Sequence, residues 1–275
     1  MRRPPALLAP YVEEIVGYRM AGSQPGEHVG MPSRHLTFIV SFDDPLELAV
    51  LPDGRRQTTR FDAMLGGLHT TPAVIRHDGS QHGIELNVTP AGARVLFGLP
   101  AGALAATVVP LDTLWGRLAG ELLDRLDAAS SWAERFSVVE GVLLRALSAR
   151  VEIPSGARPE TTEAWRRLEA MAGRVEIGEL AADVGWSRRH LTDRFTSEFG
   201  VGPKQLARVL RFEESVKMMR RPRRPTMASI AAECGYADQA HMAREWRQLA
   251  GSSPSQWLAA EQLPFVQDAE PVAGG

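Results

Sequence analysis

The chain has 275 residues, enough for one large or two modest domains with buried cores. Apolar residues make up 44% of it and no apolar run approaches the length of a membrane span, so we expect a folded protein without a membrane partner. The first residues hold only a short apolar stretch broken by prolines, and no signal peptide is expected. The single cysteine, Cys234, excludes an internal disulfide framework and favours a cytoplasmic location.

Charge is distributed unevenly along the chain. The formal net charge is −2, yet residues 188–224 contain eleven Lys and Arg against four Asp and Glu, an excess of seven positive charges. Such a patch can neutralise nucleic-acid phosphates while the rest of the chain stays soluble. A solvated basic surface is the simpler alternative, and charge alone does not decide between the two.

Short apolar or alternating runs predict β-strands in the first half of the chain. They lie at 36–42, 46–51, 73–76 and 84–88, and Gly, Pro and Asp separate them as turns require. This pattern predicts a small barrel or sandwich. A short helix is expected over 90–97, with Thr89 as its N-cap, Pro90 at its first position and Gly98 as its stop.

Two longer amphipathic helices are predicted next, over 111–128 and 131–150. Their short connection predicts an antiparallel hairpin. One interpretation is that the hairpin packs on the β-rich part as ordinary core. The other is that one of its faces forms a dimer interface, and the sequence favours neither.

The stretch 151–160 has two prolines, one glycine and no apolar periodicity, so it is predicted to be a linker. We therefore divide the chain into an N-terminal domain over 1–150, the linker, a helical domain over 161–261 and a flexible tail over 262–275. The N-terminal domain comprises the β-rich part, at about 1–98, and the helices, at about 111–150.

The helical domain repeats itself with a period near 50 residues. The segment 180–186, LAADVGW, returns at 230–236 as IAAECGY, and Gly200-x-x-Pro203 returns as Gly251-x-x-Pro254. Each position of the first pair holds the same residue type or a close physical substitute. Two copies of one supersecondary unit are therefore predicted.

Each copy has the pattern of a helix-turn-helix. In the first, a short helix ends at Gly185, where a positive φ costs glycine little, and Ser187 caps a second helix. On that second helix Leu191, Phe195 and Phe199 share one face, which leaves an opposite polar face. The second copy repeats this plan with Gly235 at the turn, Asp238 at the cap, and Met242 and Trp246 facing inward.

These motifs resemble the DNA-binding domain of the AraC/XylS family of bacterial transcription regulators. The resemblance covers 161–261 and includes both helix-turn-helix copies in order. It implies a protein that binds double-stranded DNA and regulates transcription. It also implies two subdomains joined rigidly by a helix over about 203–219, with each recognition helix entering one of two successive major grooves.

The resemblance also implies which side chains contact DNA. In the first recognition helix, Arg189 is expected to pair with guanine, Thr192 to reach a base edge and Arg188 to contact phosphate. Asp193 would accept from cytosine or orient an arginine. The corresponding residues of the second recognition helix are Gln239, Ala240, Ala243 and Arg244.

Within the second recognition helix, Gln239 is expected to recognise adenine and Arg244 guanine, and the two alanines offer only apolar contact. We therefore expect the first unit to read its half of the DNA site more strictly than the second. His190 and His241 either contact phosphate or pack at the edge of the core.

In this family the N-terminal part resembles a cupin-like barrel followed by helices, which binds an effector or dimerises. The implied fold class is α+β, a β-rich cupin-like barrel with a helical hairpin and an all-α domain with two helix-turn-helix subdomains. A small-molecule effector, RNA polymerase and a second copy of the chain are the further partners this implies, and the residues that would bind an effector are unknown.

A metal-binding or catalytic cupin fused to a DNA-binding module is the alternative function. Its ligands would come from the histidines and the glutamate of the first half, namely His28, His35, His69, His77, His82 and Glu85. No closely spaced His-x-His pair occurs, and no phosphate loop or nucleophile elbow is visible. We expect no metal, no cofactor and no enzymatic activity.

Overall fold

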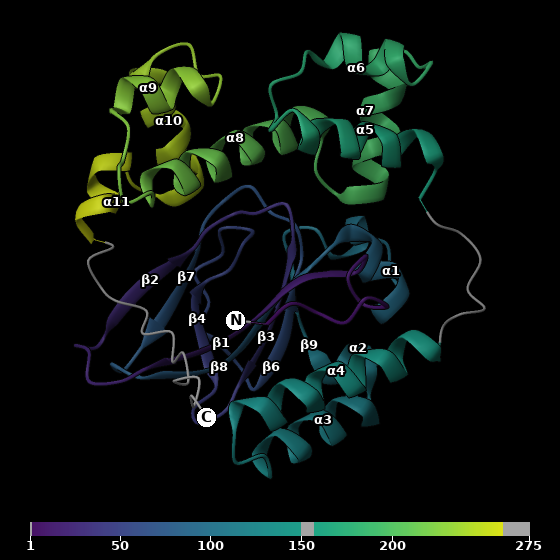
Figure 1. Cartoon of the computed structure of the whole chain (residues 1–275), viewed down its shortest axis with the longest axis vertical. Coiled ribbons are helices and arrows are strands. Elements are labelled where there is room, and N and C mark those ends of the chain that lie inside the picture. The colour runs from purple at the N-terminus through teal and green to yellow at the C-terminus, as the bar shows by residue number, and fades with distance from the viewer. Residues whose placement is uncertain (1, 150–156, 261–275) are drawn as a thin grey trace, which may run out of the picture.

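The structure is a computed structural model that describes residues 2–149 and 157–260 (Figure 1). Its N-terminal part contains two antiparallel sheets. The first has the strand order β1-β8-β3-β6-β9 and the second β2-β7-β4-β5. The strands are β1 (Val12–Met20), β2 (Gly26–Gly30), β3 (Leu36–Ser41), β4 (Leu46–Val50), β5 (Thr59–Phe61), β6 (Ala63–Gly66), β7 (Ala73–His77), β8 (Gln81–Val88) and β9 (Val108–Pro110).

The four predicted strands are present as β3, β4, β7 and β8, whereas the sequence did not predict the other five. The two sheets pack against each other through a buried cluster in which Ile39 and Met64 of the first sheet meet Leu48 and Ile75 of the second. Strand pairing among the described residues does not join the two sheets, so the observed architecture is two packed sheets and the expected closed barrel is not established.

Helix α1 (Pro90–Phe97) confirms the short helix predicted after the last strand. The hydroxyl of Thr89 accepts from the Gly92 N–H at 3.1 Å, and Gly98 ends the helix with φ +77°. A single 3₁₀ turn, η1 (Ala101–Leu104), follows.

The prediction of one helix over 111–128 was wrong, because the segment divides into α2 (Leu111–Trp115) and α3 (Arg117–Asp127). Gly116 lies between them with φ +53° and ψ −124°, a conformation that only glycine adopts readily, and it breaks the hydrogen-bond ladder. The turn lets the buried Trp115 indole donate to the Leu96 carbonyl at 2.9 Å.

The second long helix is α4 (Trp132–Ser148), which begins with a capping box formed by Ser131 and Glu134. Residue Arg150, where the prediction ended it, is outside the described residues. Helix α4 packs on α3 and α1, and the Trp132 ring covers Gly17 of β1. The core-packing role of this helical pair is therefore seen directly, whereas its role as a dimer interface stays a prediction.

Seven helices are described in the C-terminal part: α5 (Pro159–Ala170), α6 (Ile177–Asp183), α7 (Arg188–Phe199), α8 (Pro203–Met219), α9 (Met227–Glu233), α10 (Gln239–Ala250) and α11 (Pro254–Ala260). Helix α5 begins inside the last residues of the predicted linker. The linker residues 151–156 and the tail 262–275 lie outside the described residues. In Figure 1 α8 spans the distance between the α5–α7 group and the α9–α11 group.

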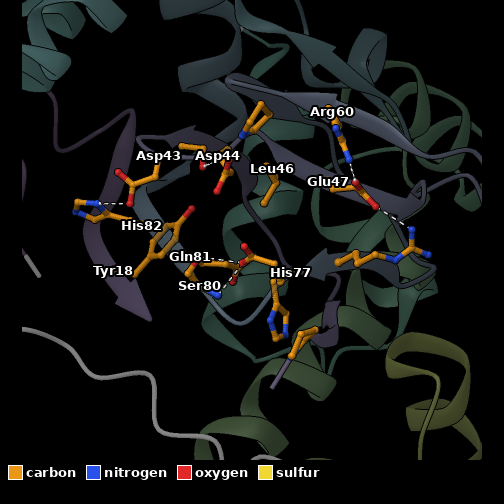
Figure 2. Close-up of a pocket in the computed structure, with 15 residues that line it drawn as sticks. Tyr18, Asp43, Asp44, Leu46, Glu47, Arg60, His77, Ser80, Gln81 and His82 are labelled. Carbon is orange, nitrogen blue, oxygen red and sulfur yellow. Dashed lines mark hydrogen bonds and ion pairs between the residues drawn. The ribbon is translucent and has the colours of Figure 1, made fainter. Parts of the chain in front are cut away.

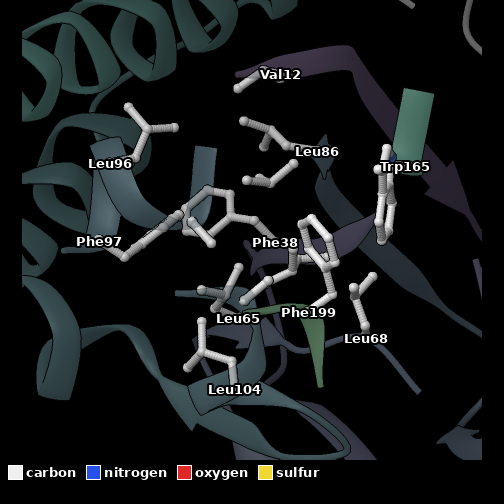
Figure 3. Packing of buried hydrophobic residues seen from close by; sticks show 14 of the residues in the cluster. Val12, Phe38, Leu65, Leu68, Leu86, Leu96, Phe97, Leu104, Trp165 and Phe199 are labelled. Carbon is white, nitrogen blue, oxygen red and sulfur yellow. The ribbon is translucent and has the colours of Figure 1, made fainter. Parts of the chain in front are cut away.

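Two buried clusters divide the helical part unequally. The first subdomain, α5–α7, shares one apolar cluster with the sheets, in which Trp165 and Phe199 lie near Leu68 (Figure 3). The second subdomain, α9–α11, has its own cluster around Trp246 and Phe212. None of the helices in the described ranges is long and apolar enough to cross a bilayer.

Candidate nucleic-acid interface

The two helix-turn-helix units have matching turns and caps. Gly185 and Gly235 both adopt positive φ, +75° and +78°, where the chain reverses between the two helices of each unit. The Ser187 hydroxyl accepts from the N–H of His190 at 3.2 Å, and an Asp238 carboxylate oxygen accepts from the N–H of His241 at 2.6 Å. The repeat seen in the sequence is therefore a repeat of geometry.

An aromatic residue follows the glycine in both turns and packs edge-on against a histidine. The ring centroids of Trp186 and His190 are 4.7 Å apart, and those of Tyr236 and His241 are 5.6 Å apart. His241 Nδ1 also accepts from the Ala237 N–H at 3.2 Å. These contacts favour the packing interpretation of both histidines. The two anchors differ in burial, since Tyr236 is buried and Trp186 is only half-buried.

The inner faces of both recognition helices are buried, as the spacing predicts. On α7, Leu191, Phe195 and Phe199 are all buried, and Phe195 stacks on Trp165 of α5. On α10, the buried Trp246 indole donates to the Ser215 hydroxyl of α8 at 2.9 Å. The buried face of α7 thus packs on α5 and that of α10 on α8, which leaves their other faces for recognition.

On α7 the structure exposes three of the four side chains expected to contact DNA. Arg188, Arg189 and Asp193 are exposed, and the Arg189 guanidinium lies 3.9 Å from the Asp193 carboxylate. Asp193 is therefore placed to orient Arg189. Thr192 is half-buried and its hydroxyl donates to the Arg188 carbonyl at 2.9 Å, which leaves its methyl group and two acceptor lone pairs for a base edge.

On α10 Gln239, Ala240 and Arg244 are exposed and Ala243 is half-buried. At helical spacing the four side chains lie along one side of α10 that adjoins its buried face. The structure thus brings each predicted set together on one helix face, and the contacts with DNA stay predictions.

The basic patch of the sequence is partly internal, which corrects its interpretation as a phosphate-binding surface. On α8, Arg208 Nε lies 2.9 Å from the buried carboxylate of Glu245, and Arg211 lies 3.4 Å from the same group. Arg211 also donates to the Gly173 carbonyl at 3.2 Å. These two arginines join α10 to α8, and Arg211 also joins α8 to the loop after α5. The sequence gave no indication of these ion pairs, because nothing in its pattern marks Glu245, the neighbour of the inward-facing Trp246, as their acceptor.

The helical domain is docked on the sheets by an ion cluster around Arg34, which the sequence analysis missed. The Arg34 backbone N–H and guanidinium donate to the Glu213 carboxylate of α8 at 3.0 and 3.1 Å. The same guanidinium contacts Glu13 of β1 at 2.8 Å and Glu169 of α5 at 3.4 Å. One side chain therefore connects the first sheet to two helices of the C-terminal part.

A second docking point joins α1 and η1 to the end of α7. Arg94 contacts the Glu198 carboxylate through two nitrogens at 2.9 and 2.6 Å. A Cβ on Gly102 would lie 2.6 Å from the Ser197 carbonyl oxygen, so only glycine allows this close approach. The far end of α7, where Arg188 and Arg189 lie, stays exposed.

Three histidines of the N-terminal part have separate local partners. His82 contacts Asp43 and Arg135, His35 contacts Glu13, and His69 Nδ1 lies 3.0 Å from the Gly67 carbonyl oxygen. Within residues 2–149 and 157–260, no three His, Cys, Asp or Glu side chains are grouped as metal ligands. The alternative of a metal-binding cupin gains no support from this geometry.

The model of a helix-turn-helix domain family matches residues 180–260. The uncharacterized HTH-type transcriptional regulator YbfI of Bacillus subtilis is 31% identical over 74 residues, which are 27% of this chain and 26% of that protein. The HTH-type transcriptional regulator Rv1931c of Mycobacterium tuberculosis is 33% identical over 88 residues, 32% of this chain and 34% of that protein. The chain thus matches about a quarter to a third of the length of these curated relatives.

Solved structures match over most of the chain. ToxT from Vibrio cholerae has a TM-score of 0.53 with 12% identity, covering 90% of this chain and 97% of that one. A structure of ToxT bound to an unsaturated fatty acid has the same TM-score with 11% identity, covering 94% and 97%. At this identity the likeness concerns the fold, a two-sheet N-terminal domain followed by a helical domain.

Proposed function

We propose that the chain is a sequence-specific DNA-binding transcription regulator of the AraC/XylS type. The observation that carries the proposal is the pair of matched units, whose recognition helices are buried on one side and expose polar side chains on the other. An ordinary helical bundle needs neither the duplicated glycine turn nor the exposed arginines.

Each recognition helix would enter a major groove with its N-terminal half. The exposed Arg188 and Arg189 lie at the start of α7, and Gln239 and Ala240 lie at the start of α10. Helix α8 would fix the two helices for successive grooves on one face of the duplex. The second site would be read mainly by Gln239 and Arg244, because alanines offer only a methyl group.

Selection of bound duplexes from a random pool by the purified full chain tests this proposal. We expect enrichment of one bipartite sequence whose two conserved halves are separated by about one helical turn. Enrichment of only one short half-site would indicate that a single helix-turn-helix unit recognises DNA sequence. Recovery of no sequence above the starting pool would contradict sequence-specific binding.

We also propose that the two-sheet domain is a cupin-like effector-binding module that acts in the cytoplasm. The solved ToxT with its unsaturated fatty acid has a similar fold, and the two sheets here surround a cavity of their own (Figure 2). Dimerisation through α3 and α4 and contact with RNA polymerase are further proposals from the same resemblance. Sedimentation of the full chain, with and without DNA, measures its oligomeric state and so tests the proposed dimer. A chain that stays monomeric both free and on DNA would contradict it.

A further inference from the structure

The two helix-turn-helix subdomains contact each other directly, in addition to their connection through α8. The contact is made by the segment 171–176, which joins α5 to α6 in the first subdomain. Gly173 of this segment is buried with φ +71°, and a Cβ there would lie 2.2 Å from the Ala207 carbonyl oxygen of α8. Only glycine allows the segment to lie this close to the helix.

Arg174 forms the first of two bridges between the subdomains. Its guanidinium donates to the Glu233 carbonyl at 2.7 Å, and this carbonyl belongs to the last turn of α9, where no N–H of the helix is available. Its Nε atom also donates to the Met171 carbonyl at 3.2 Å, within its own segment. A Cβ at Gly235 would lie 2.9 Å from the Arg174 Cγ atom, so the second turn packs directly on this side chain.

Arg211 of α8 forms the second bridge. Its guanidinium donates to the Gly173 carbonyl of the first subdomain at 3.2 Å and lies 3.4 Å from the Glu245 carboxylate of α10. The side chains of Arg211 and Glu245 are only 16% and 10% exposed, so water competes little for this contact. One guanidinium therefore contacts both the first subdomain and the recognition helix of the second.

These bridges supply a link that apolar packing does not provide among the described residues. Trp165 and Phe195 belong to one buried cluster, whereas Phe212 and Trp246 belong to another. Helix α8 spans the distance between the two groups of helices (Figure 1). Hydrogen bonds weaken steeply when their geometry is disturbed, whereas apolar contacts have no preferred direction. The bridges therefore resist rotation of the second subdomain about α8.

We propose that Arg174 and Arg211 are positioning residues that determine the spacing accepted between the two halves of the DNA site. This inference rests on the proposed function, in which α7 and α10 enter successive major grooves. One added base pair moves the second groove by about 3.4 Å along the duplex and rotates it by about a tenth of a turn. A second subdomain held by both bridges cannot follow this movement, so the parent chain accepts one spacing.

Arg208 of α8 provides a matched control. Its Nε atom lies 2.9 Å from the same Glu245 carboxylate, and it also contacts Gln248. In the described part of the chain both of these partners belong to α10, so Arg208→Ala leaves the two bridges in place. Arg211→Ala breaks one bridge and still leaves Arg208 to pair with Glu245.

The distance between two spin labels, measured in the full chain, tests the bridges without DNA. Glu179→Cys on α6 and Ala228→Cys on α9 place one label on an exposed position of each subdomain. Cys234 is buried, and Cys234→Ala in every sample leaves the two introduced thiols as the only ones. Pulsed electron resonance then gives the distribution of distances between the subdomains.

We expect a narrow distribution in the labelled parent and in its Arg208→Ala variant, and a broader one after Arg211→Ala. Arg174→Ala should also broaden it, and this exposed side chain provides the second readout if Arg211→Ala fails to fold. Equal widths in the parent and in both bridge variants would show that α8 alone holds the subdomains, which overturns the proposal.

Binding to duplexes of altered spacing is the second measurement. One base pair is inserted or deleted between the two halves of the selected site. We expect the parent chain and Arg208→Ala to lose about tenfold in affinity at each altered spacing, and Arg211→Ala only about threefold. The ratio of affinities on two duplexes does not change when less of the protein is folded, so it separates positioning from stability.

The two proposals fail separately. If no DNA sequence is selected, the regulator function is refuted, and the label distances still decide whether the bridges hold the subdomains together. If a specific site is selected but Arg211→Ala and Arg208→Ala show the same dependence on spacing, only the role of the bridges in spacing is refuted.

Discussion

The Arg189 side chain projects from the first turn of α7 with 93% of its surface exposed, beside the Asp193 carboxylate. An exposed ion pair of this kind contributes little free energy, so Arg189 can exchange its contact with Asp193 for one with a base edge. Arg223, in the loop before α9, is also exposed but lies outside both recognition helices. Comparing variants of the two arginines therefore distinguishes base-specific contacts from the general attraction of positive charge to phosphate.

We predict that Arg189→Ala loses about 1–3 kcal/mol of binding free energy on the selected duplex and much less on random DNA. Arg223→Ala should weaken binding to both duplexes equally, by counterion release alone. Fluorescence anisotropy with both duplexes at one salt concentration measures the difference. Equal losses on the two duplexes for Arg189→Ala would contradict its base contact.

The Glu13 carboxylate makes folding sensitive to acid. Its hydrogen bond to His35, with Arg34 nearby, lowers the pKa of Glu13 to about 2 from an ordinary 4.5. A carboxyl whose pKa is lower in the folded state contributes stability above its ordinary pKa, and loses it as the pH falls through the folded value.

We therefore predict that Glu13→Gln is less stable than the parent chain near pH 6 and that this difference shrinks as the pH falls from about 4.5 to about 2. Urea unfolding of both proteins at about pH 6 and about pH 3 measures it. A difference that does not change with pH would show that Glu13 is not ionised at this contact.

Among the elements, the helix-turn-helix turns could be predicted from the sequence because their signals are local. A glycine at a positive φ, a capping side chain and apolar residues at four-residue steps act within one unit, and they recur in α9 and α10. Strand β1 gave no such signal. Its sequence, VEEIVGYRM, does not alternate strictly. Its pairing with β8 is irregular between Val12 and Glu14, and the Trp132 ring of α4 covers Gly17.

The residues that line the cavity between the two sheets could not be predicted from the sequence either. Tyr18 of β1, Asp44 of the β3–β4 turn and His77 of β7 line the cavity between the two sheets, and only the packing of the sheets brings them together. Their residue types carry no spacing rule, and the histidines were considered only as metal ligands. In contrast, the residues predicted to face DNA share one helix in each copy, where residue spacing fixes the face.

At the scale of an element, the turn of the first unit can be tested by one glycine. Gly185 has φ +75° with open space where a Cβ would lie. Gly185→Ala should therefore lower the free energy of unfolding by about 1 kcal/mol, through backbone strain alone. Gly141 lies inside α4, also with open space around it, and Gly141→Ala should instead gain about 0.5–1 kcal/mol. Denaturant unfolding measures both, and effects of the same sign would contradict the assigned turn geometry.

For the whole molecule, Arg34 is the side chain that most directly joins the two parts. It is 19% exposed and contacts three carboxylates that belong to β1, α5 and α8. Removing it leaves the Glu213 carboxylate, itself 14% exposed, without its guanidinium partner.

We predict that Arg34→Ala lowers the free energy of unfolding by about 1–3 kcal/mol. Arg166→Ala, which removes an exposed pair with Glu163 within α5, should change it by less than about 1 kcal/mol. Urea titration compares the two variants. A loss for Arg34→Ala no larger than for Arg166→Ala would mean that the ion cluster does not hold the domains together.

The apolar cluster shared by the sheets and the first subdomain determines which parts of the chain unfold together. Trp165 and Phe195 belong to the same buried cluster as Phe38, whereas Trp246 belongs to a separate one. Cooperative opening follows shared packing and not chain order, so the first helix-turn-helix melts with the sheets and the second can open alone. A fragment that starts at residue 157 would therefore expose the apolar surface that normally meets Leu68, and its stability would underestimate that of the same helices in the intact chain.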